Sequence, residues 1–254
     1  MQNRTRDVNN EIYHQLGERW YTAQDDPIAL LRAESRLRNP WVQETLQNRF
    51  GTESLKVLDV GCGGGFLSNF LAQAGHDVTG VDLSEESLKV ARQYDSTQTV
   101  NYVQRDAKQL EFPDSSFDVV CAMDFLEHVD APADVIRECA RVLKPTGLFF
   151  FHTFNRNWIS NLIVIRGVEW VVKNVPQDLH VYALFIRPVE LAQYCSEADL
   201  HFVEMKGMRP RTFSKPFLRM LFKGTVSDDF KFDFTSSLLT GYCGFAIKRD
   251  HFNC

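Results

Sequence analysis

Three side chains that can move a proton or bind a metal stand within five residues of "DFLEHVDAP": Asp124, Glu127 and His128. On a helix beginning at residue 124 they would lie at positions i, i+3 and i+4, on one face. Two carboxylates and an imidazole suit Mg²⁺, Mn²⁺ or Zn²⁺. They equally suit proton transfer, with Glu127 and His128 as catalytic residues, or an ordinary helix start. The residues alone leave these three interpretations open.

A glycine loop, "VLDVGCGGGF", carries a second chemical signal. Gly61, Gly63 and Gly65 permit a tight turn and close backbone approach to a ligand. A helix follows, so we expect its free N–H groups to face that ligand. A dinucleotide fingerprint requires a small residue where Phe66 stands, and Asp59 would repel a pyrophosphate. The loop therefore favours a cationic ligand such as S-adenosylmethionine over NAD.

Acidic residues at two further strand ends complete the predicted cofactor site. Asp82 lies 21 residues after Gly61, at the distance where a carboxylate accepts hydrogen bonds from ribose hydroxyls. Asp106 could meet the adenine edge, and Ala107 could supply backbone contacts. The predicted cofactor-binding set is Asp59, Gly61, Gly63, Gly65, Asp82, Leu83, Asp106, Ala107 and Met123.

These residues must be positioned by alternating strands and helices. The predicted strands are 54–61, 76–84, 99–107, 117–123 and 148–154, and the predicted helices between them are 65–75, 84–95 and 132–147. This order predicts an α/β fold with a parallel sheet and helices on both faces. The carboxyl edge of such a sheet binds ligands, so we expect residues 124–128 to lie beside the glycine loop.

The flanking segments are less regular. We predict one domain over 1–254, with an N-terminal helical cap at 1–50 and a cofactor-binding core at 54–153. Lid helices, a penultimate strand and an insertion at about 208–240 occupy 154–240, and a final strand occupies 241–249. The last two strands should form an antiparallel hairpin, giving seven strands in a mostly parallel sheet.

Composition excludes several other classes. The 28 basic and 33 acidic residues give a net charge of -5, which does not favour a nucleic-acid partner. Six cysteines without a CxxC pair argue against a zinc ribbon or a disulfide framework, and fit a reducing cytoplasm. No run reaches about 18 apolar residues, and the N-terminus has no apolar signal-peptide region. We therefore expect a cytoplasmic protein.

The run "VLDVGCGGG…VTGVDLS…VQRDA…FDVVCAMDFLEHV…VLKPTG" resembles the class I S-adenosylmethionine-dependent methyltransferases over residues 54–153. "MDFLEHV", "FNRN" and "VPQDLHVYALFIRPVEL" are similar to segments of the ubiquinone-biosynthesis O-methyltransferases, over most of 10–207 and the last strand. The resemblance implies a class I methyltransferase Rossmann-like fold and a polyprenylated phenol or catechol as acceptor. It implies a divalent cation, such as Mg²⁺, at Asp124, Glu127 and His128. It also draws attention to His180, a second candidate base.

The chain departs from that family at several positions. Val42 stands where the family has a cofactor-holding arginine, whose role Arg36 or Arg38 could take over. Asp124 replaces a glutamate, and Leu184 replaces a lysine. Residues 208–240 have little counterpart. Two alternatives therefore stay open: a methyltransferase for another lipid or small-molecule acceptor, and a non-catalytic S-adenosylmethionine-binding sensor or scaffold.

A polyprenylated acceptor resides in a bilayer, so the enzyme needs a way to reach it. Residues 158–175 are mostly apolar, although Arg166, Glu169 and Lys173 interrupt them, and they contain Trp158 and Trp170; residues 206–223 interleave basic and apolar side chains. Both segments predict peripheral contact at the inner face of a membrane. The alternative for 158–175 is a buried lid helix. Oligomeric state is not predicted.

Overall fold

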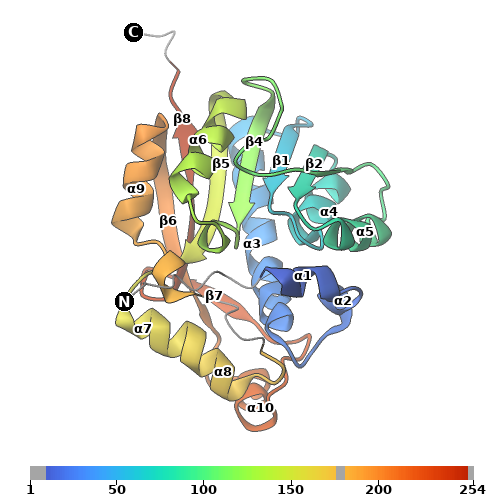
Figure 1. Cartoon of the computed structure of the whole chain (residues 1–254), viewed down its shortest axis with the longest axis vertical. Helices are drawn as coiled ribbons and strands as arrows, with labels where there is room; N and C mark the ends of the chain where they lie inside the picture. The colour runs from blue at the N-terminus through green and yellow to red at the C-terminus, as the bar shows by residue number, and fades with distance from the viewer. Residues whose placement is uncertain (1–9, 176–180, 251–254) are drawn as a thin grey trace, which may run out of the picture.

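The computed structural model describes residues 10–175 and 181–250, and it is built around one mixed sheet (Figure 1). Eight strands hydrogen-bond in the order β3-β2-β1-β4-β5-β8-β6-β7 within the described residues. Their bounds are β1 Lys56–Val60, β2 Asp77–Asp82, β3 Asn101–Gln104, β4 Phe117–Met123, β5 Leu143–Phe154, β6 Leu200–Pro210, β7 Phe232–Thr235 and β8 Gly241–Lys248.

The first five strands are parallel, as the alternation of strands and helices predicts. β1 pairs with β2 so that Asp59 lies opposite Gly80, and with β4 so that Asp59 lies opposite Cys121. β1 and β4 are almost wholly buried, because both faces of the sheet are covered. The parallel register brings the carboxyl ends of β1, β2 and β4 to one edge.

Helices cover both faces of the sheet. Trp41 and Leu71, from α3 and α4, pack on one face beside Val57 and Phe150. Val135 of α6 and Leu191 of α9 pack on the other face. The helices of this framework are α3 Pro27–Phe50, α4 Phe66–Gln73, α5 Glu85–Tyr94, α6 Pro132–Val142 and α9 Pro188–Glu197.

The antiparallel half of the sheet confirms the predicted terminal hairpin. β8 lies between β5 and β6 and runs antiparallel to both, with Phe151 opposite Gly244 and Met205 opposite the same glycine. The count differs from the predicted seven, because β7 forms inside the 208–240 segment. There Phe234 pairs with Met208 on β6, so β7 hydrogen-bonds an edge of β6 that would otherwise be open.

Further helices lie beyond the carboxyl edge of the sheet (Figure 1). They are α1 Glu11–Gln15, α2 Arg19–Thr22, the 3₁₀ helix η1 Leu126–His128, α7 Trp158–Ser160, the π-helical turn η2 Asn161–Gly167, α8 Val168–Val171, the 3₁₀ helix η3 Tyr182–Leu184 and α10 Lys215–Lys223. α7, η2 and α8 follow one another directly, within the stretch predicted as one apolar helix. Among the described residues, no helix has both the length and the apolarity needed to span a bilayer.

Candidate active site

A cavity of about 1210 Å³ lies at the carboxyl edge of β1, β2 and β4. Its lining contains most of the predicted cofactor-binding residues: Asp59, Gly61, Gly63, Asp82, Leu83, Asp106, Ala107 and Met123. Asp124, Glu127 and His128 line the same cavity. The sequence therefore predicts which residues the sheet brings together here. The predicted base His180 falls outside the described residues.

The glycine loop is shaped by its own neighbours. Gly61 and Gly63 have φ of +69° and +52°, which side chains rarely adopt. A Cβ on Gly61 would lie 2.2 Å from the Phe125 ring. The N–H of Gly61 donates to the carbonyl of Val81 at 2.8 Å, and that of Gly63 donates to Asp82 at 2.9 Å. These two N–H groups therefore bind β2 and not a ligand, whereas the prediction concerned the first N–H groups of α4, which begins at Phe66.

Asp82 is held at the end of β2 by two backbone donors. Its carboxylate accepts from Gly63 at 2.9 Å and from Ser84 at 2.8 Å. Burial raises the pKa of Asp82 above its ordinary value. The neighbouring Leu83 is exposed to the cavity despite being apolar. A fixed carboxylate beside an apolar surface suits a ribose and the face of an adenine.

Asp59 and Asp106 differ in their surroundings. Asp59 is buried and accepts a hydrogen bond of 2.6 Å from the hydroxyl of Ser68. Burial raises the pKa of Asp59 to about 7. Asp106 is exposed and accepts from the N–H of Lys108, so it caps a turn while also lining the cavity.

Gly65, which belongs to the predicted cofactor-binding set, does not line the cavity. Its φ is +81°, and it forms the left-handed start of α4. A Cβ there would lie 2.4 Å from the hydroxyl of Tyr102 and 2.8 Å from Ala91. Gly65 therefore permits the turn and the close packing of the loop against α5 and β3.

The acidic motif does not begin a regular helix. Asp124 has φ of +55°, and the 3₁₀ helix covers only Leu126–His128. The prediction that Asp124, Glu127 and His128 share one helical face is therefore wrong. The reason is local: the backbone N–H of Asp124 donates to the carbonyl of His152 on β5. This contact extends the sheet pairing by one residue and delays the helical turn.

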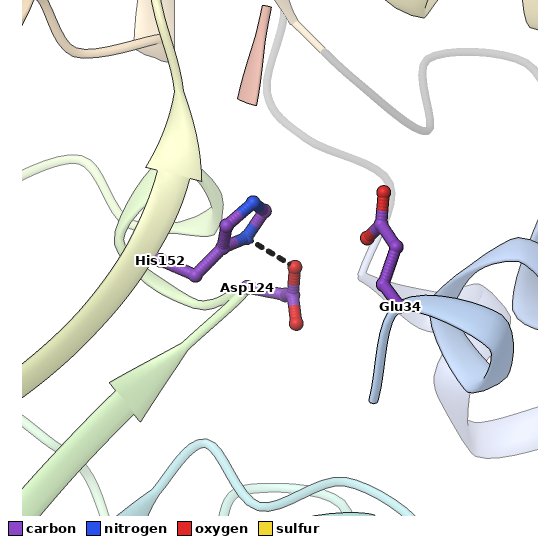
Figure 2. Close-up of side chains that lie close together, drawn as sticks. All are labelled: Glu34, Asp124 and His152. Carbon is purple, nitrogen blue, oxygen red and sulfur yellow. Dashed lines mark ion pairs between the residues drawn. The ribbon is translucent and has the colours of Figure 1, made fainter. Parts of the chain in front are cut away.

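Asp124 instead pairs with two buried side chains, the guanidinium of Arg38 and the imidazole of His152. The guanidinium of Arg38 on α3 binds both carboxylate oxygens, with 2.7 Å from Nη1 to Oδ1. Nδ1 of His152 lies 2.5 Å from Oδ1, the contact drawn in Figure 2. Burial alone would raise the pKa of Asp124, but Arg38 and His152 hold it well below its usual range. Asp124 is therefore an ionised carboxylate whose two oxygens both have partners.

Glu127 and His128 remain neutral in neighbouring positions. Glu127 is 2% exposed, and its carboxyl oxygens make no hydrogen bond of ordinary geometry to any described residue. Burial and the charge of Asp124 raise the pKa of Glu127 to about 8. Burial lowers the pKa of His128 to about 4, although the charge of Asp124 acts in the opposite direction. At neutral pH, His128 is therefore an unprotonated imidazole on the cavity wall.

The arrangement of possible metal ligands differs from the predicted set. Among the described residues, Glu34, Asp124 and His152 have ligand atoms within 4.8 Å of one another, and Figure 2 shows their side chains converging. Asp124, Glu127 and His128 do not form such a group in that part of the chain. Because Arg38 occupies both oxygens of Asp124, these residues do not fit a divalent cation as they stand.

Sequence reasoning missed Glu34 and did not support His152. Arg38 was one of two candidates to replace the arginine absent at Val42, and it lies one helical turn before that position. Arg36, the other candidate, instead donates to the carbonyl of Phe230. The signal for Glu34 was its place one turn before Arg38, which aligns the two side chains on α3.

The far end of the cavity is apolar. It is lined by side chains of α3, the η2–α8 segment and α10. α8 and α10 lie close to each other (Figure 1). Its wall includes Leu30, Val164, Val168, Val171, Met220 and Leu221. One cavity therefore joins a polar end at the glycine loop to an apolar end among the additional helices.

Comparisons with known proteins identify the family. The methyltransferase-domain family Methyltransf_11 matches residues 58–151. The ubiquinone biosynthesis O-methyltransferase of Thiobacillus denitrificans is 41% identical over 209 residues, which are 81% of this chain and 88% of that relative. The enzyme of the same name from Bordetella bronchiseptica is 43% identical over 202 residues, which are 78% and 82% of the two chains.

Solved structures show the same fold at low identity. Magnesium protoporphyrin IX methyltransferase from Synechocystis PCC 6803, solved with bound SAH, has a TM-score of 0.59 at 18% identity, covering 85% of this chain and 84% of that one. The [4+2]-cyclase SpnF has a TM-score of 0.56 at 18% identity, covering 84% and 82%. SpnF, named as a cyclase, shows that the fold alone does not fix the reaction. The sequence relatives do: this chain is an S-adenosylmethionine-dependent O-methyltransferase and belongs to the ubiquinone biosynthesis O-methyltransferase family.

Proposed function

We propose that this enzyme methylates a phenolic hydroxyl on a ring that carries a long apolar tail, as a polyprenylated precursor of ubiquinone does. The observation that carries the proposal is the continuity of the cavity. Its polar end holds Asp82, Asp124 and His128, while its other end is lined by apolar side chains of α3, α8 and α10. A small polar acceptor would leave that apolar wall in contact with water, at a cost of about 25 cal/mol per Å².

The cofactor end suits S-adenosylmethionine. When bound, S-adenosylmethionine supplies a methyl group on a sulfonium, and the acceptor oxygen takes that methyl as the carbon–sulfur bond breaks. Asp82 would bind the ribose hydroxyls through oxygens already oriented by Gly63 and Ser84. Leu83 would contact the adenine. Asp59, held by Ser68, would keep acidic character near the cationic centre.

A phenol has a pKa of about 10, so its proton must leave for efficient attack. His128 is the candidate base, because it lines the cavity as an unprotonated imidazole near the ionised Asp124; its pKa of about 4 makes it a weak base in the absence of ligands. The charge of Asp124 would stabilise the imidazolium that forms. Glu127, with a pKa near 8, would remain protonated at neutral pH and would donate a hydrogen bond to an acceptor oxygen.

Two leucines of α10 provide a matched test of the tail site. Leu221 lines the cavity and is 44% exposed, whereas Leu218 does not line it and is 42% exposed. Leu221→Asn should raise KM for a prenylated catechol by about tenfold, since losing roughly 1–2 kcal/mol of apolar contact has that effect. Leu218→Asn should change KM less than twofold. Equal effects of the two variants on labelled-methyl transfer would contradict the proposed tail site.

The same outer helices support peripheral membrane contact through 158–175 and 206–223. Trp158, Trp170 and Phe222 are exposed there, which suits the headgroup level. The basic residues of 206–223 support membrane contact less than the sequence suggests, because Arg211 pairs with Asp233 and Arg219 pairs with Asp229. Vesicle co-sedimentation should therefore fall with Trp158→Ser and Trp170→Ser more than with added salt. If the variant that combines Trp158→Ser and Trp170→Ser co-sediments with vesicles as fully as the wild type, the membrane contact is refuted.

A second candidate function is methylation of another lipid-like acceptor. The apolar end favours it equally, because its wall does not recognise the ring. An acceptor panel of tailed catechols, tailed monophenols and fatty acids distinguishes the two: transfer to fatty acids alone would replace the phenol proposal.

A further inference from the structure

The pairing of Asp124 with Arg38 leaves the carboxylate no free oxygen. Arg38 donates from both terminal nitrogens, one to each oxygen of Asp124, and Nδ1 of His152 contacts Oδ1 at 2.5 Å. Such paired guanidinium–carboxylate hydrogen bonds are among the strongest in proteins. Their strength grows here because Arg38 and His152 are 2% and 0% exposed, away from competing water.

The backbone fixes the same carboxylate from its other side. The N–H of Asp124 donates to the carbonyl of His152 at 3.2 Å, so one β5 residue holds both the main chain and the side chain. The ring of His152 is fully buried and packs close to the backbone of Gly241, which limits its movement. Asp124 is therefore held in one position before any ligand arrives.

A divalent cation at this carboxylate would have to displace the guanidinium. Glu34, Asp124 and His152 are close enough to share an ion. A cation bound to Asp124 would lie within a few ångströms of Arg38, where like charges repel. Displacement would also break two charge-assisted hydrogen bonds and leave a buried guanidinium without its bidentate partner, which is strongly unfavourable.

We propose that Arg38 is the resident cation of this site: its guanidinium supplies at Asp124 the positive charge that a divalent metal would otherwise supply, so Asp124 is not a metal ligand. Arg38 acts as a positioning residue, through Asp124, on the acceptor end of the cavity. The consequence for methyl transfer, which rests on the proposed function, is that turnover does not require an added divalent cation.

Binding of Mn²⁺ to the chelator-treated wild-type protein tests the inference without relying on activity. An electron paramagnetic resonance titration should show no saturable site below millimolar Mn²⁺. Labelled-methyl transfer to a prenylated catechol should change less than twofold on addition of EDTA or Mg²⁺. A stoichiometric micromolar Mn²⁺ site, or a loss of transfer with EDTA that Mg²⁺ restores, would overturn it.

Arginine variants sharpen the test. Arg38→Met removes the guanidinium but keeps an unbranched apolar stem, so Asp124 should become available and Mn²⁺ affinity should increase at least tenfold. Arg38→Lys keeps a positive charge and should not gain the site. Arg36→Met, at an exposed arginine on the same helix, is the matched control and should behave as wild type. Unchanged Mn²⁺ affinity in folded Arg38→Met would contradict the inference.

A second variant covers the case in which Arg38→Met does not fold. Arg38→Met with Asp124→Asn removes both charges, so it should fold and should not gain Mn²⁺ binding. If the double variant instead binds Mn²⁺ as tightly as Arg38→Met does, Asp124 is not the ligand that Arg38 shields. Failure of the proposed function is distinguishable: the wild type would transfer no methyl to any phenol, while its Mn²⁺ titration would still decide the role of Arg38.

Discussion

Asp82→Asn should weaken cofactor binding while leaving the fold intact. The substitution keeps the size of the side chain and one oxygen acceptor. It replaces the other oxygen with an amide that can only donate. In the wild type, both oxygens accept from backbone N–H groups, of Gly63 and Ser84, and both remain close to the cavity.

The expected magnitude follows from those contacts. A hydrogen bond to a charged carboxylate contributes about 1.5–3 kcal/mol, against about 1 kcal/mol for a neutral pair. Replacing one charged acceptor of a ribose hydroxyl should therefore cost roughly 2 kcal/mol, which is about a 30-fold increase in Kd. Burial already raises the pKa of Asp82, so its carboxylate is costly to keep ionised without a ligand.

Isothermal titration calorimetry with S-adenosylhomocysteine measures the change directly. Asp77→Asn is the matched control, because Asp77 begins the same strand, β2, at its opposite end and is exposed. It should bind the ligand as wild type does. If Asp82→Asn also stays within twofold of the wild-type Kd, Asp82 does not hold the ribose and the cofactor placement is refuted.

The remaining predictions concern the two neutral groups beside Asp124. His128→Gln should lower kcat for labelled-methyl transfer by about 100-fold while KM changes less than threefold, since a positioned base contributes at that scale. His201 is exposed on β6, so His201→Gln is the control. An equal fall of kcat in the two variants would remove the base role of His128. Because the pKa of Glu127 rises from 4.5 to about 8, the folded protein keeps a proton that the unfolded chain releases. Its free energy of unfolding should therefore fall as pH rises from 5 to 8, by roughly 1.4 kcal/mol per unit from this group. Glu127→Gln should lack that contribution. If the free energy of unfolding in urea changes equally between pH 6 and pH 8 in the wild type and in Glu127→Gln, Glu127 does not carry a buried proton.

The glycine-loop end of the cavity was predictable because its rules are local. A buried strand followed by glycines, and aspartates at successive strand ends, place Asp59, Gly61 and Asp82 at one edge whatever the distant sequence does. Leu83 and Met123 follow from their adjacency to those strand ends. Gly65 shows the limit of the pattern, because the contact that requires a glycine is the hydroxyl of Tyr102 on another strand.

The surroundings of Asp124 depend on contacts between distant segments. Arg38 and Asp124 are 86 residues apart, and neither sequence neighbourhood indicates the other. Helical spacing from residue 124 failed because one backbone hydrogen bond to His152 keeps Asp124 out of the helix. β7, the strand that the prediction of seven strands lacked, likewise depends on pairing with the edge of β6. Spacing rules describe an isolated segment, whereas these features arise from packing.

The most direct test of the account compares two acceptors with the wild-type enzyme. Labelled-methyl transfer is measured to a catechol carrying a short isoprenoid tail and to the same catechol without it. Burial of even part of one five-carbon unit contributes a few times the roughly 0.8 kcal/mol of a single CH₂ group. The continuous polar and apolar cavity predicts a kcat/KM at least about 30-fold higher for the tailed catechol. Equal values for the two acceptors, or transfer to neither, would contradict the assignment of the apolar end to the acceptor.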